Sequence, residues 1–264
     1  MIAMLRNLWD YRYFIANSIW NDFYGRLVRS RLGAAWLVLQ PLSQVLIYAF
    51  ILSGLLSSKL PGQTNPHAYA IYLMAGLLAW NLFAEVLDRC LKVFVANANI
   101  MKKVQFPRIA LPVIAIGSAA LNNMILFAVM VVILIPLGHD ISWSFLYIFL
   151  MMPVVTLLAA GIGIFLGVVN VFVRDVEQVV PIVLQVLFWF TPVVYPVSII
   201  PAQYIGFLEM GPMFHMVTSY HDAIVYNTEP ALMPIAIIAF IAVLLCGLAL
   251  LVFRRANADM VDIL

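Results

Sequence analysis

Residues 109–137 read IALPVIAIGSAALNNMILFAVMVVILIPL and contain no charged side chain. A helix that crosses the hydrocarbon core of a bilayer needs about 20 mostly apolar residues, and this stretch exceeds that length. We therefore expect residues 109–137 to form a membrane-spanning helix that tilts or projects beyond the bilayer.

The rest of the chain repeats this pattern. Of its 264 residues, 65% are hydrophobic and 10% are charged, whereas soluble domains are about half apolar and about a quarter charged. The other predicted spans are Ala34–Leu56, Tyr69–Leu87, Phe145–Phe172, Val179–Val197 and Leu232–Phe253. The sequence therefore predicts an all-α integral membrane protein, with one transmembrane domain over residues 1–264 and a six-span bundle over residues 34–253.

Lys and Arg are confined to alternate connections between these runs. Those before the first span, after the second and fourth spans, and after the sixth span hold Arg6, Arg12, Arg26, Arg29, Arg31, Arg89, Lys92, Lys102, Lys103, Arg108, Arg174, Arg254 and Arg255. Lys59 is the one exception. Because positive side chains concentrate on the cytoplasmic side of a membrane, we expect both termini in the cytoplasm and residues 254–264 to form a cytoplasmic tail.

Residues 1–33 are expected to form an amphipathic helix in the cytoplasmic interface of the membrane. Apolar side chains recur at helical spacing at Leu8, Tyr11, Ile15, Ile19, Phe23 and Leu27. Trp and Tyr side chains lie among them, and these rings favour the headgroup region. The alternative is an ordinary helix packed on the bundle.

Residues 198–230 are too interrupted by proline and glycine to span a membrane. Irregular backbone at membrane depth is tolerated only where protein or a water-filled cavity shields it. We expect short re-entrant helices in the outer leaflet, before the last span. An ordinary outer loop is the alternative.

Small and charged side chains in the spans indicate packing. Ala159, Gly163 and Gly167 stand four residues apart, a spacing that lets helix backbones approach closely.

Glu85 and Asp88 have Arg89 and Lys92 within one helical turn, which favours local ion pairs. The neutral side chains Gln44, Asn122, Asn123, Thr156 and Gln185 suit interhelical hydrogen bonds or the wall of a polar cavity.

Signals for catalysis are weak. The sequence contains no GxxxxGK[ST] nucleotide-binding loop and no HExxH zinc motif. Cys90 and Cys246 lack metal-ligand spacing and are expected to be buried apolar side chains. We therefore expect no metal site and no catalytic residue. A membrane-embedded transferase would have to use His215, His221 and Asp222, which are otherwise polar residues of the outer segment.

The connection over residues 97–108 reads NANIMKKVQFPR. Ile100, Met101, Val104 and Phe106 alternate with polar and basic residues, and a solvated loop would not need these apolar side chains. A small amphipathic helix ended by Pro107 fits better. Such a helix would dock either on lipid headgroups or on a soluble partner.

Aromatic side chains gather in the first, second and fifth predicted spans. Many of them suit the aromatic belt of a membrane protein. The alternative is that some line a translocation path, since aromatic faces stack on the C–H faces of sugar rings. The candidates for such a lining are Trp36, Tyr48, Phe50, Trp80, Phe83, Phe188, Trp189 and Tyr195.

Several short motifs, in order along nearly the whole chain, resemble the permease subunits of ABC-2 type polysaccharide exporters, which transport O-antigen, capsule or teichoic-acid polymers. These motifs are Arg31-Leu-Gly33 with Trp36, Gln40 and Pro41, then Asn97–Arg108, Arg174-Asp175-Val176, Thr191-Pro-Val-Val-Tyr-Pro196 and Ile199-Ile-Pro201. The chain departs from the family pattern at Gly211-Pro212 and at Tyr220-His221-Asp222.

The resemblance implies a homodimer in the bacterial cytoplasmic membrane that pairs with two separate ATPase subunits. A lipid-linked polysaccharide would pass through a channel between the two permease subunits. This chain would bind no cofactor and no nucleic acid, because ATP and Mg²⁺ would be held by the ATPases. The coupling helix would span residues 97–106, and the residues implied in coupling are Asn97, Asn99, Met101, Lys102, Lys103, Phe106, Arg174 and Asp175. An ABC-2 permease for a smaller lipid, drug or lipo-oligosaccharide is the alternative.

Overall fold

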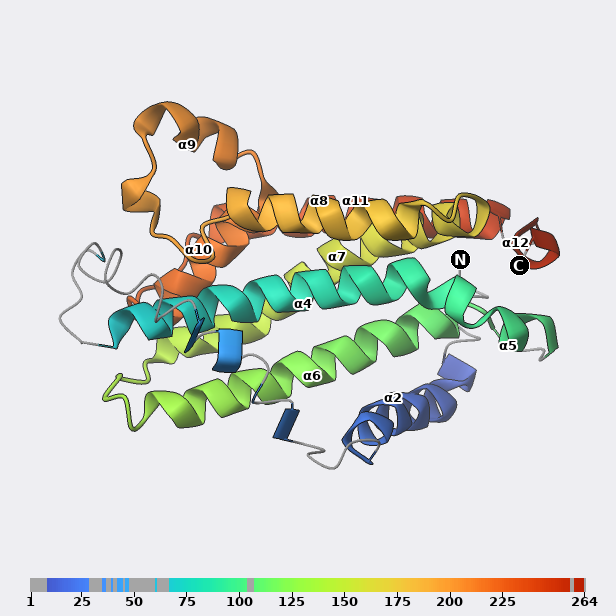
Figure 1. Ribbon diagram of the computed structural model, residues 1–264, viewed down its shortest axis with the longest axis horizontal. Coiled ribbons are helices and arrows are strands. Elements are labelled where there is room, and N and C mark those ends of the chain that lie inside the picture. Colours follow the sequence, from blue (N-terminus) through green and yellow to red (C-terminus); the bar gives the residue numbers. More distant parts are fainter. Residues whose placement is uncertain are drawn as a thin grey trace.

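The computed structural model describes residues 9–28, 35–36, 39, 42–44, 46–47, 60, 67–103, 107–256 and 259–263. Within these residues the regular structure is helical, and no strand occurs. The longest helices run alongside one another as a bundle (Figure 1). The predicted all-helical fold is therefore confirmed for the described part of the chain.

Among the described residues, four helices are long and apolar enough to cross a membrane. They are α4 (Ala68–Ala96), α6 (Ala110–Leu134), α7 (Tyr147–Phe172) with the preceding 3-10 turn η2 (Trp143–Leu146), and α11 (Leu232–Ala256). They match the second, third, fourth and sixth predicted spans. Most of α4 and α7 is buried inside the bundle, whereas α6 and α11 leave much of their apolar surface exposed, as expected for helices that face lipid.

The fifth predicted span is shorter than the sequence indicates. Helix α8 covers Val176–Phe190 and has 15 residues, so it ends before the predicted limit at Val197. The chain turns at Thr191, because the next residue is Pro192 and the carbonyl groups that follow are bound by side chains of α4. Most of the first predicted span, Ala34–Leu56, lies outside the described residues. Six crossings and two cytoplasmic termini therefore stay predictions.

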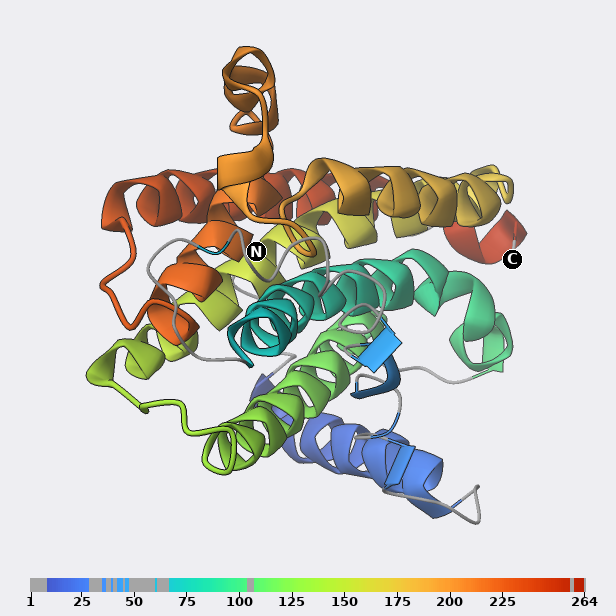
Figure 2. The same cartoon turned by 60° about the vertical axis from the view of Figure 1, so that its left-hand side comes forward.

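The N-terminal helix α2 (Arg12–Val28) packs across α6 (Figure 2). Ile15 is buried, and Ile19 lies directly against Gly117, where the absent side chain leaves room for it. The outward-facing rings Trp9, Tyr13, Trp20 and Tyr24 are more than half exposed. Helix α2 thus packs on the bundle, and its position in the membrane interface stays a prediction.

The segment after α8 forms the expected short helices. These are η3 (Val197–Ile199), α9 (Ala202–Leu208) and α10 (Pro212–Ile224). Helix α9 stands away from the bundle and has no buried residue, whereas α10 enters the bundle and packs on α4 and α7 (Figure 1). The entry of this segment into the outer leaflet stays a prediction.

Small residues hold α7 close to α4, as predicted. A side chain added at Gly163 would place its Cβ atom 2.7 Å from Cβ of Cys90 and 3.0 Å from the carbonyl oxygen of Leu87. Gly167 is equally close to the backbone of Cys90, and Ala159 is fully buried. The spacing of four therefore marks the contact face of α7.

The bundle end opposite α9 carries the exposed cationic side chains Lys102, Arg174, Arg254 and Arg255. We call it the basic end. Two short helices, α5 (Ala98–Lys103) and α12 (Asp259–Ile263), lie there (Figure 1). The predicted tail over residues 254–264 is therefore not extended in its described part: α11 continues to Ala256, and α12 packs against α5 and α7.

Candidate functional site

The predicted coupling segment is a short helix set off from α4 by a turn. Asn97 ends α4, and its side-chain Nδ2 donates a hydrogen bond to the carbonyl oxygen of Val93 at 2.8 Å. Helix α5 follows, and Pro107 begins the turn that leads into α6. The predicted helix over residues 97–106 is thus confirmed over 98–103, whereas Phe106 lies outside the described residues.

The two faces of α5 differ in the way the sequence predicts. Met101 is 3% exposed and lies in an apolar cluster at the basic end. Asn99 and Lys102 are exposed on the surface. One side chain thus anchors α5 to the bundle while polar groups face outward, which leaves them available to a partner. Lys103 is the last residue of α5, and its side chain lies outside the described part of the structure.

The apolar cluster around Met101 joins the ends of several helices. We call it the basic-end cluster, and its buried members are Val93, Phe94, Met101, Ile109, Leu111, Val168, Val171, Phe253 and Met260. Phe94 and Phe253 stack with ring centroids 5.4 Å apart, which joins α4 to α11. The cluster is separate from the main core of the bundle. A displacement of α5 would therefore be transmitted to α4, α7 and α11 together.

Met260 is the member of this cluster that the sequence analysis missed. It is fully buried although it belongs to the short helix α12 near the C-terminus. The only local hint is the pattern Asp259-Met-Val-Asp-Ile263, in which apolar residues stand beside acidic ones, and it does not indicate which of them is buried.

Arg174 and Asp175 lie at the same end of the bundle. They are exposed in the turn between α7 and α8, and the carbonyl oxygen of Asp175 accepts hydrogen bonds from the N–H groups of Gln178 and Val179 in the first turn of α8. The structure thus brings Asn99, Lys102, Arg174 and Asp175 to one end, although they come from two separate connections. Their role in coupling stays a prediction.

The candidate aromatic lining falls into two groups. Trp80 and Phe83 of α4 contact each other with ring centroids 5.8 Å apart, and Trp80 meets Phe188 of α8 edge to face at 5.5 Å. Trp189 packs against Phe188 at 5.5 Å. These four rings form one aromatic cluster between α4 and α8, in which Trp80 and Phe83 are buried and Trp189 is 54% exposed.

The other four candidates lie outside that cluster. The hydroxyl of Tyr195 donates to the carbonyl oxygen of Trp189 at 2.7 Å, so its ring is held near the end of α8. Trp36 is exposed. Tyr48 and Phe50 lie outside the described residues. A lining role for any of the eight rings stays a prediction.

Helix α8 leaves most of its apolar surface uncovered by the described part of the chain. Val180 is its one buried side chain there, while Val179, Ile182, Val183, Val186, Trp189 and Phe190 are all exposed by 47% or more. Gln185, a neutral polar side chain, is exposed among them. Such a surface suits contact with lipid or with another protein chain.

The turn after α8 is tied to α4 at the end opposite the basic end. The hydroxyl of Tyr69 donates to the carbonyl oxygen of Val194 at 2.8 Å. The hydroxyl of Tyr72 lies 3.0 Å from the carbonyl oxygen of Pro192 and 2.9 Å from that of Tyr195. The motif at residues 191–196 is therefore a docking segment, with α4 as its partner.

His221 of α10 completes this contact. Its ring stacks on Tyr72 with centroids 3.6 Å apart and an interplanar angle of 17°. Its Nε2 lies 3.1 Å from the carbonyl oxygen of Tyr72, which can only accept, so this nitrogen carries the hydrogen. Burial lowers the pKa of His221 to about 3, against the smaller opposing effect of that hydrogen bond, so the ring is neutral at physiological pH.

The residues of the transferase hypothesis do not converge. His221 and Asp222 line a cavity of about 230 Å³ beside Tyr72 and Thr218. His215 is not part of its lining, and its Nε2 bonds the carbonyl oxygen of Glu209 instead. Burial raises the pKa of Asp222. Within the described ranges, no cluster of three or more His, Cys, Asp or Glu side chains is placed to hold a metal ion.

The predicted ion pairs near the basic end are confirmed. Lys92 Nζ lies 2.7 Å from Asp88 Oδ1, and Arg89 Nη2 lies 2.6 Å from Glu85 Oε1. Two further partners come from other helices: Asp22 of α2 binds Arg89 at 3.2 Å, and Asn122 of α6 binds Glu85 at 2.9 Å. Asn122 thus makes the kind of interhelical hydrogen bond that the sequence suggested.

Residues 15–225 match the family described as ABC-2 type transporter, which is well over half of the chain. The chain belongs to this family. It is therefore a membrane domain of the ABC-2 type, and its four apolar helices are consistent with that fold.

Similar proteins match most or nearly all of the chain. An O-antigen export system permease protein RfbA from Klebsiella pneumoniae is 28% identical over 97% of this chain and 96% of its own length. RfbA from Myxococcus xanthus is 24% identical over 99% of each chain. The polysialic acid transport protein KpsM from Escherichia coli is 25% identical over 85% of this chain and 87% of its own.

Proposed function

We propose that this ABC-2 chain is the membrane subunit of an ATP-driven exporter of lipid-linked polysaccharide in the bacterial cytoplasmic membrane. The observation that carries the proposal is the likeness, over most or nearly all of both chains, to permeases named for O-antigen export and polysialic acid transport. The chain itself contains no nucleotide-binding loop of the GxxxxGK[ST] type, so ATP and Mg²⁺ belong on a separate subunit.

The ATPase subunit docks at the basic end. Helix α5 supports this assignment, because Met101 anchors it while Asn99 and Lys102 face outward. Arg174 and Asp175 extend the same polar end. Complementary charge across such a contact selects the partner and speeds its association. The basic-end cluster then passes the motion of α5 to the spans when ATP draws two ATPase subunits together.

A second copy of this chain covers the exposed face of α8. The many uncovered apolar side chains of that helix support a homodimer, and Gln185 among them suits a path for a polar substrate. The aromatic cluster of Trp80, Phe83, Phe188 and Trp189 borders this face. Aromatic faces and neutral polar groups hold sugar rings weakly, which suits a polymer that must slide past them.

The ATPase contact is tested by charge reversal at Lys102. The tagged chain is co-expressed with its ATPase, and the amount of ATPase recovered with it is measured. We expect Lys102→Glu to lower recovery at least about fivefold, because like charges across an interface are strongly unfavourable. Glu229→Lys, a charge reversal at an exposed site at the α9 end, should leave recovery unchanged. Equal recovery for Lys102→Glu would remove α5 from the contact.

The substrate class is tested in cells that lack this chain. We expect lipid-linked polysaccharide to accumulate on the cytoplasmic side and to disappear from the cell surface. Normal surface polysaccharide together with increased sensitivity to hydrophobic drugs would instead assign the chain to a smaller substrate.

A further inference from the structure

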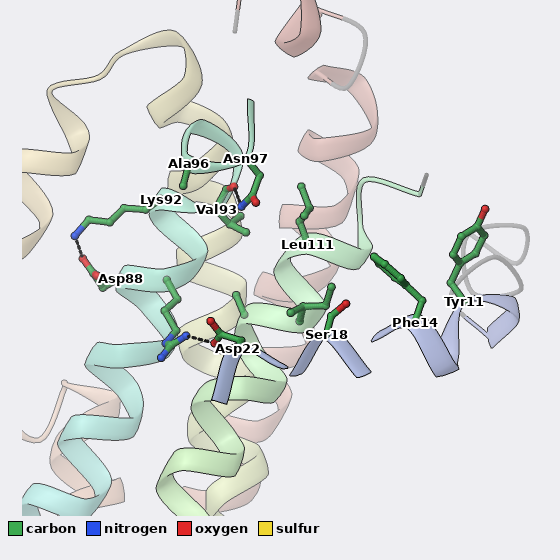
Figure 3. A pocket seen from close by; sticks show the side chains of 13 residues that line it. Tyr11, Phe14, Ser18, Asp22, Asp88, Lys92, Val93, Ala96, Asn97 and Leu111 are labelled. Carbon is green, nitrogen blue, oxygen red and sulfur yellow. Dashed lines mark hydrogen bonds and ion pairs between the residues drawn. The ribbon is translucent and has the colours of Figure 1, made fainter. Parts of the chain in front are cut away.

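A cavity of about 850 Å³ lies between α2, α4 and α6, near the basic end (Figure 3). Its volume is within the range of small-molecule sites, which is about 300–1,000 Å³. Among the described coupling candidates Asn97 lines this cavity, and no ring of the aromatic cluster does. One part of its wall is apolar and the other is charged, so an occupant must combine both characters.

The apolar part comes from α2 and α6. Phe14 of α2 is 50% exposed, and Leu111, Ile114 and Ala115 of α6 lie across from it in the lining. A ring exposed to this degree is unfavourable in water, in proportion to its apolar surface. A hydrocarbon chain along this wall would cover that surface.

The charged part holds two ion pairs. Lys92 Nζ lies 2.7 Å from Asp88 Oδ1 (Figure 3). Arg89 Nη1 lies 3.2 Å from Asp22 Oδ2. The side chains are between 21% and 42% exposed, so all four are open to a ligand. Two cations and two carboxylates thus line one cavity, and Arg89 also pairs at 2.6 Å with Glu85, which lies outside the lining. An anionic ligand would be attracted by the cations but repelled by the carboxylates. A cationic ligand would be attracted by the carboxylates but repelled by the cations.

The predicted topology places the cavity at the depth of lipid headgroups. Lys92 and Asn97 belong to the end of α4, where the apolar sequence gives way to the basic connection. Helix α2, which forms one wall, carries the exposed rings Trp9, Tyr13 and Trp20. Trp and Tyr are enriched at the boundary between membrane and water.

We infer that this cavity binds a zwitterionic phospholipid with an ammonium headgroup, of the phosphatidylethanolamine class. Lys92 and Arg89 receive the phosphate, and Asp88 and Asp22 receive the ammonium group. One acyl chain lies along Phe14, Leu111 and Ile114. The inference requires only that the chain is embedded in a membrane, and it is independent of the proposed export role.

The test measures which lipids the purified full-length chain retains. The protein is reconstituted with equal amounts of phosphatidylethanolamine and phosphatidylglycerol that carry identical acyl chains, then partially delipidated, and the bound lipids are counted by native mass spectrometry. We expect phosphatidylethanolamine to be retained at least about fivefold over phosphatidylglycerol. Both lipids offer a phosphate to the cations, but only phosphatidylethanolamine also offers an ammonium group to the carboxylates.

Three variants separate this site from general lipid contact. Asp88→Asn removes a carboxylate and leaves both cations, so the preference should move toward phosphatidylglycerol. Lys92→Gln removes a cation, so it should lower retention of phosphatidylethanolamine without raising retention of phosphatidylglycerol. Ala115→Phe narrows the apolar part and should lower retention of both lipids. Arg255→Gln, an exposed cation outside the cavity, is the matched control and should behave like the unaltered chain.

Equal retention of the two lipids by the unaltered chain would overturn the inference, and so would a preference for phosphatidylglycerol. Wild-type retention by Ala115→Phe would place the lipid elsewhere on the protein. If Asp88→Asn does not fold, unchanged retention in the Lys92→Gln variant would still overturn the proposal. Replacement of both phospholipids by an added isoprenoid diphosphate would assign the cavity to a lipid carrier instead.

Discussion

Met101 of α5 and Met260 of α12 are buried in the same apolar cluster, although 158 residues separate them in the sequence. Both helices are short, and neither has an extended interface of its own. Helix α12 packs on α5 and α7, so the end of the chain supports the segment that we assign to ATPase docking. The position of α5 therefore depends on side chains that follow the last span.

The first prediction concerns Met260 and rests on the proposed function. Met260→Ala leaves a cavity beneath α5, whereas Met260→Leu keeps the volume and should cost less than about 1.5 kcal/mol. For Met260→Ala we expect ATPase to be recovered normally, while the amount of polysaccharide exported for each ATP hydrolysed falls at least about fivefold. Met260→Leu should restore that ratio. A ratio unchanged by Met260→Ala would show that α12 does not position α5.

Tyr72 gives a prediction about the end opposite the basic end. Tyr72→Phe keeps the ring on His221 but removes the hydroxyl shared by the carbonyl oxygens of Pro192 and Tyr195. Leaving buried acceptors without a donor costs about 1–3 kcal/mol. We expect a lower temperature of thermal unfolding in detergent. Tyr204→Phe, at an exposed ring of α9, is the control, and an equal effect of both changes would contradict the docking of the 191–196 segment.

Acid should destabilise the fold through His221, which lies in α10, outside the four apolar spans. Its folded pKa is about 3, so below about pH 6.5 the unfolded chain binds a proton that the folded chain does not. As the pH decreases, the free energy of unfolding therefore decreases by about 1.4 kcal/mol per pH unit, or about 2 kcal/mol between pH 6.5 and pH 5.

The matched measurement compares unfolding temperatures at pH 7 and pH 5 for the unaltered chain and for His221→Gln. The variant loses the ring stack, so it should unfold at a lower temperature at pH 7, yet its unfolding temperature should change less between the two pH values. Asp222→Asn is the control for the neighbouring carboxyl group. Because the pKa of Asp222 is raised in the folded chain, its protonation stabilises the fold as the pH decreases, opposite to the effect of His221. An equal pH response in His221→Gln would contradict a neutral, buried ring.

Two glycine positions give a matched pair. At Gly163, an added Cβ would lie 2.7 Å from Cβ of Cys90, so Gly163→Ala should force α7 away from α4 and cost about 1–3 kcal/mol. At Gly247 of α11 a Cβ meets nothing within 4 Å, so Gly247→Ala should be neutral or stabilising by up to about 1 kcal/mol. The measurement is again thermal unfolding. Equal stability of the two variants would contradict the close approach of α4 and α7.

The long helices were predictable because their signal is local. Each of α4, α6, α7 and α11 is an apolar run that meets the length required for a span. The end of α8 was not predictable in this way. The apolar sequence continues past Phe190, but the hydroxyl groups of Tyr69 and Tyr72, more than 100 residues away in sequence, capture the backbone that follows.

In the candidate site, too, local features could be predicted from the sequence, whereas contacts between distant segments could not. The two faces of α5 follow from the alternation of apolar and polar residues, so the burial of Met101 and the exposure of Lys102 could be predicted. The burial of Met260 could not be predicted, because it requires the fold to bring α12 against α5, which lies far away in the sequence. Likewise, the pair of Arg89 with Glu85 is a local feature, whereas its contact with Asp22 requires α2 to pack across α6.

ATP-driven export of polysaccharide can be measured as transport into inside-out membrane vesicles that contain this chain and its ATPase. Lipid-linked polysaccharide is presented on the outer face of the vesicles, which corresponds to the cytoplasmic face in the cell, and its protection from an added glycan-degrading enzyme is measured with and without ATP. We expect protection to require ATP, the ATPase and this chain, and Lys102→Glu to abolish it. Protection without ATP, or ATP-driven uptake of a hydrophobic drug but not of the polysaccharide, would refute the proposed function.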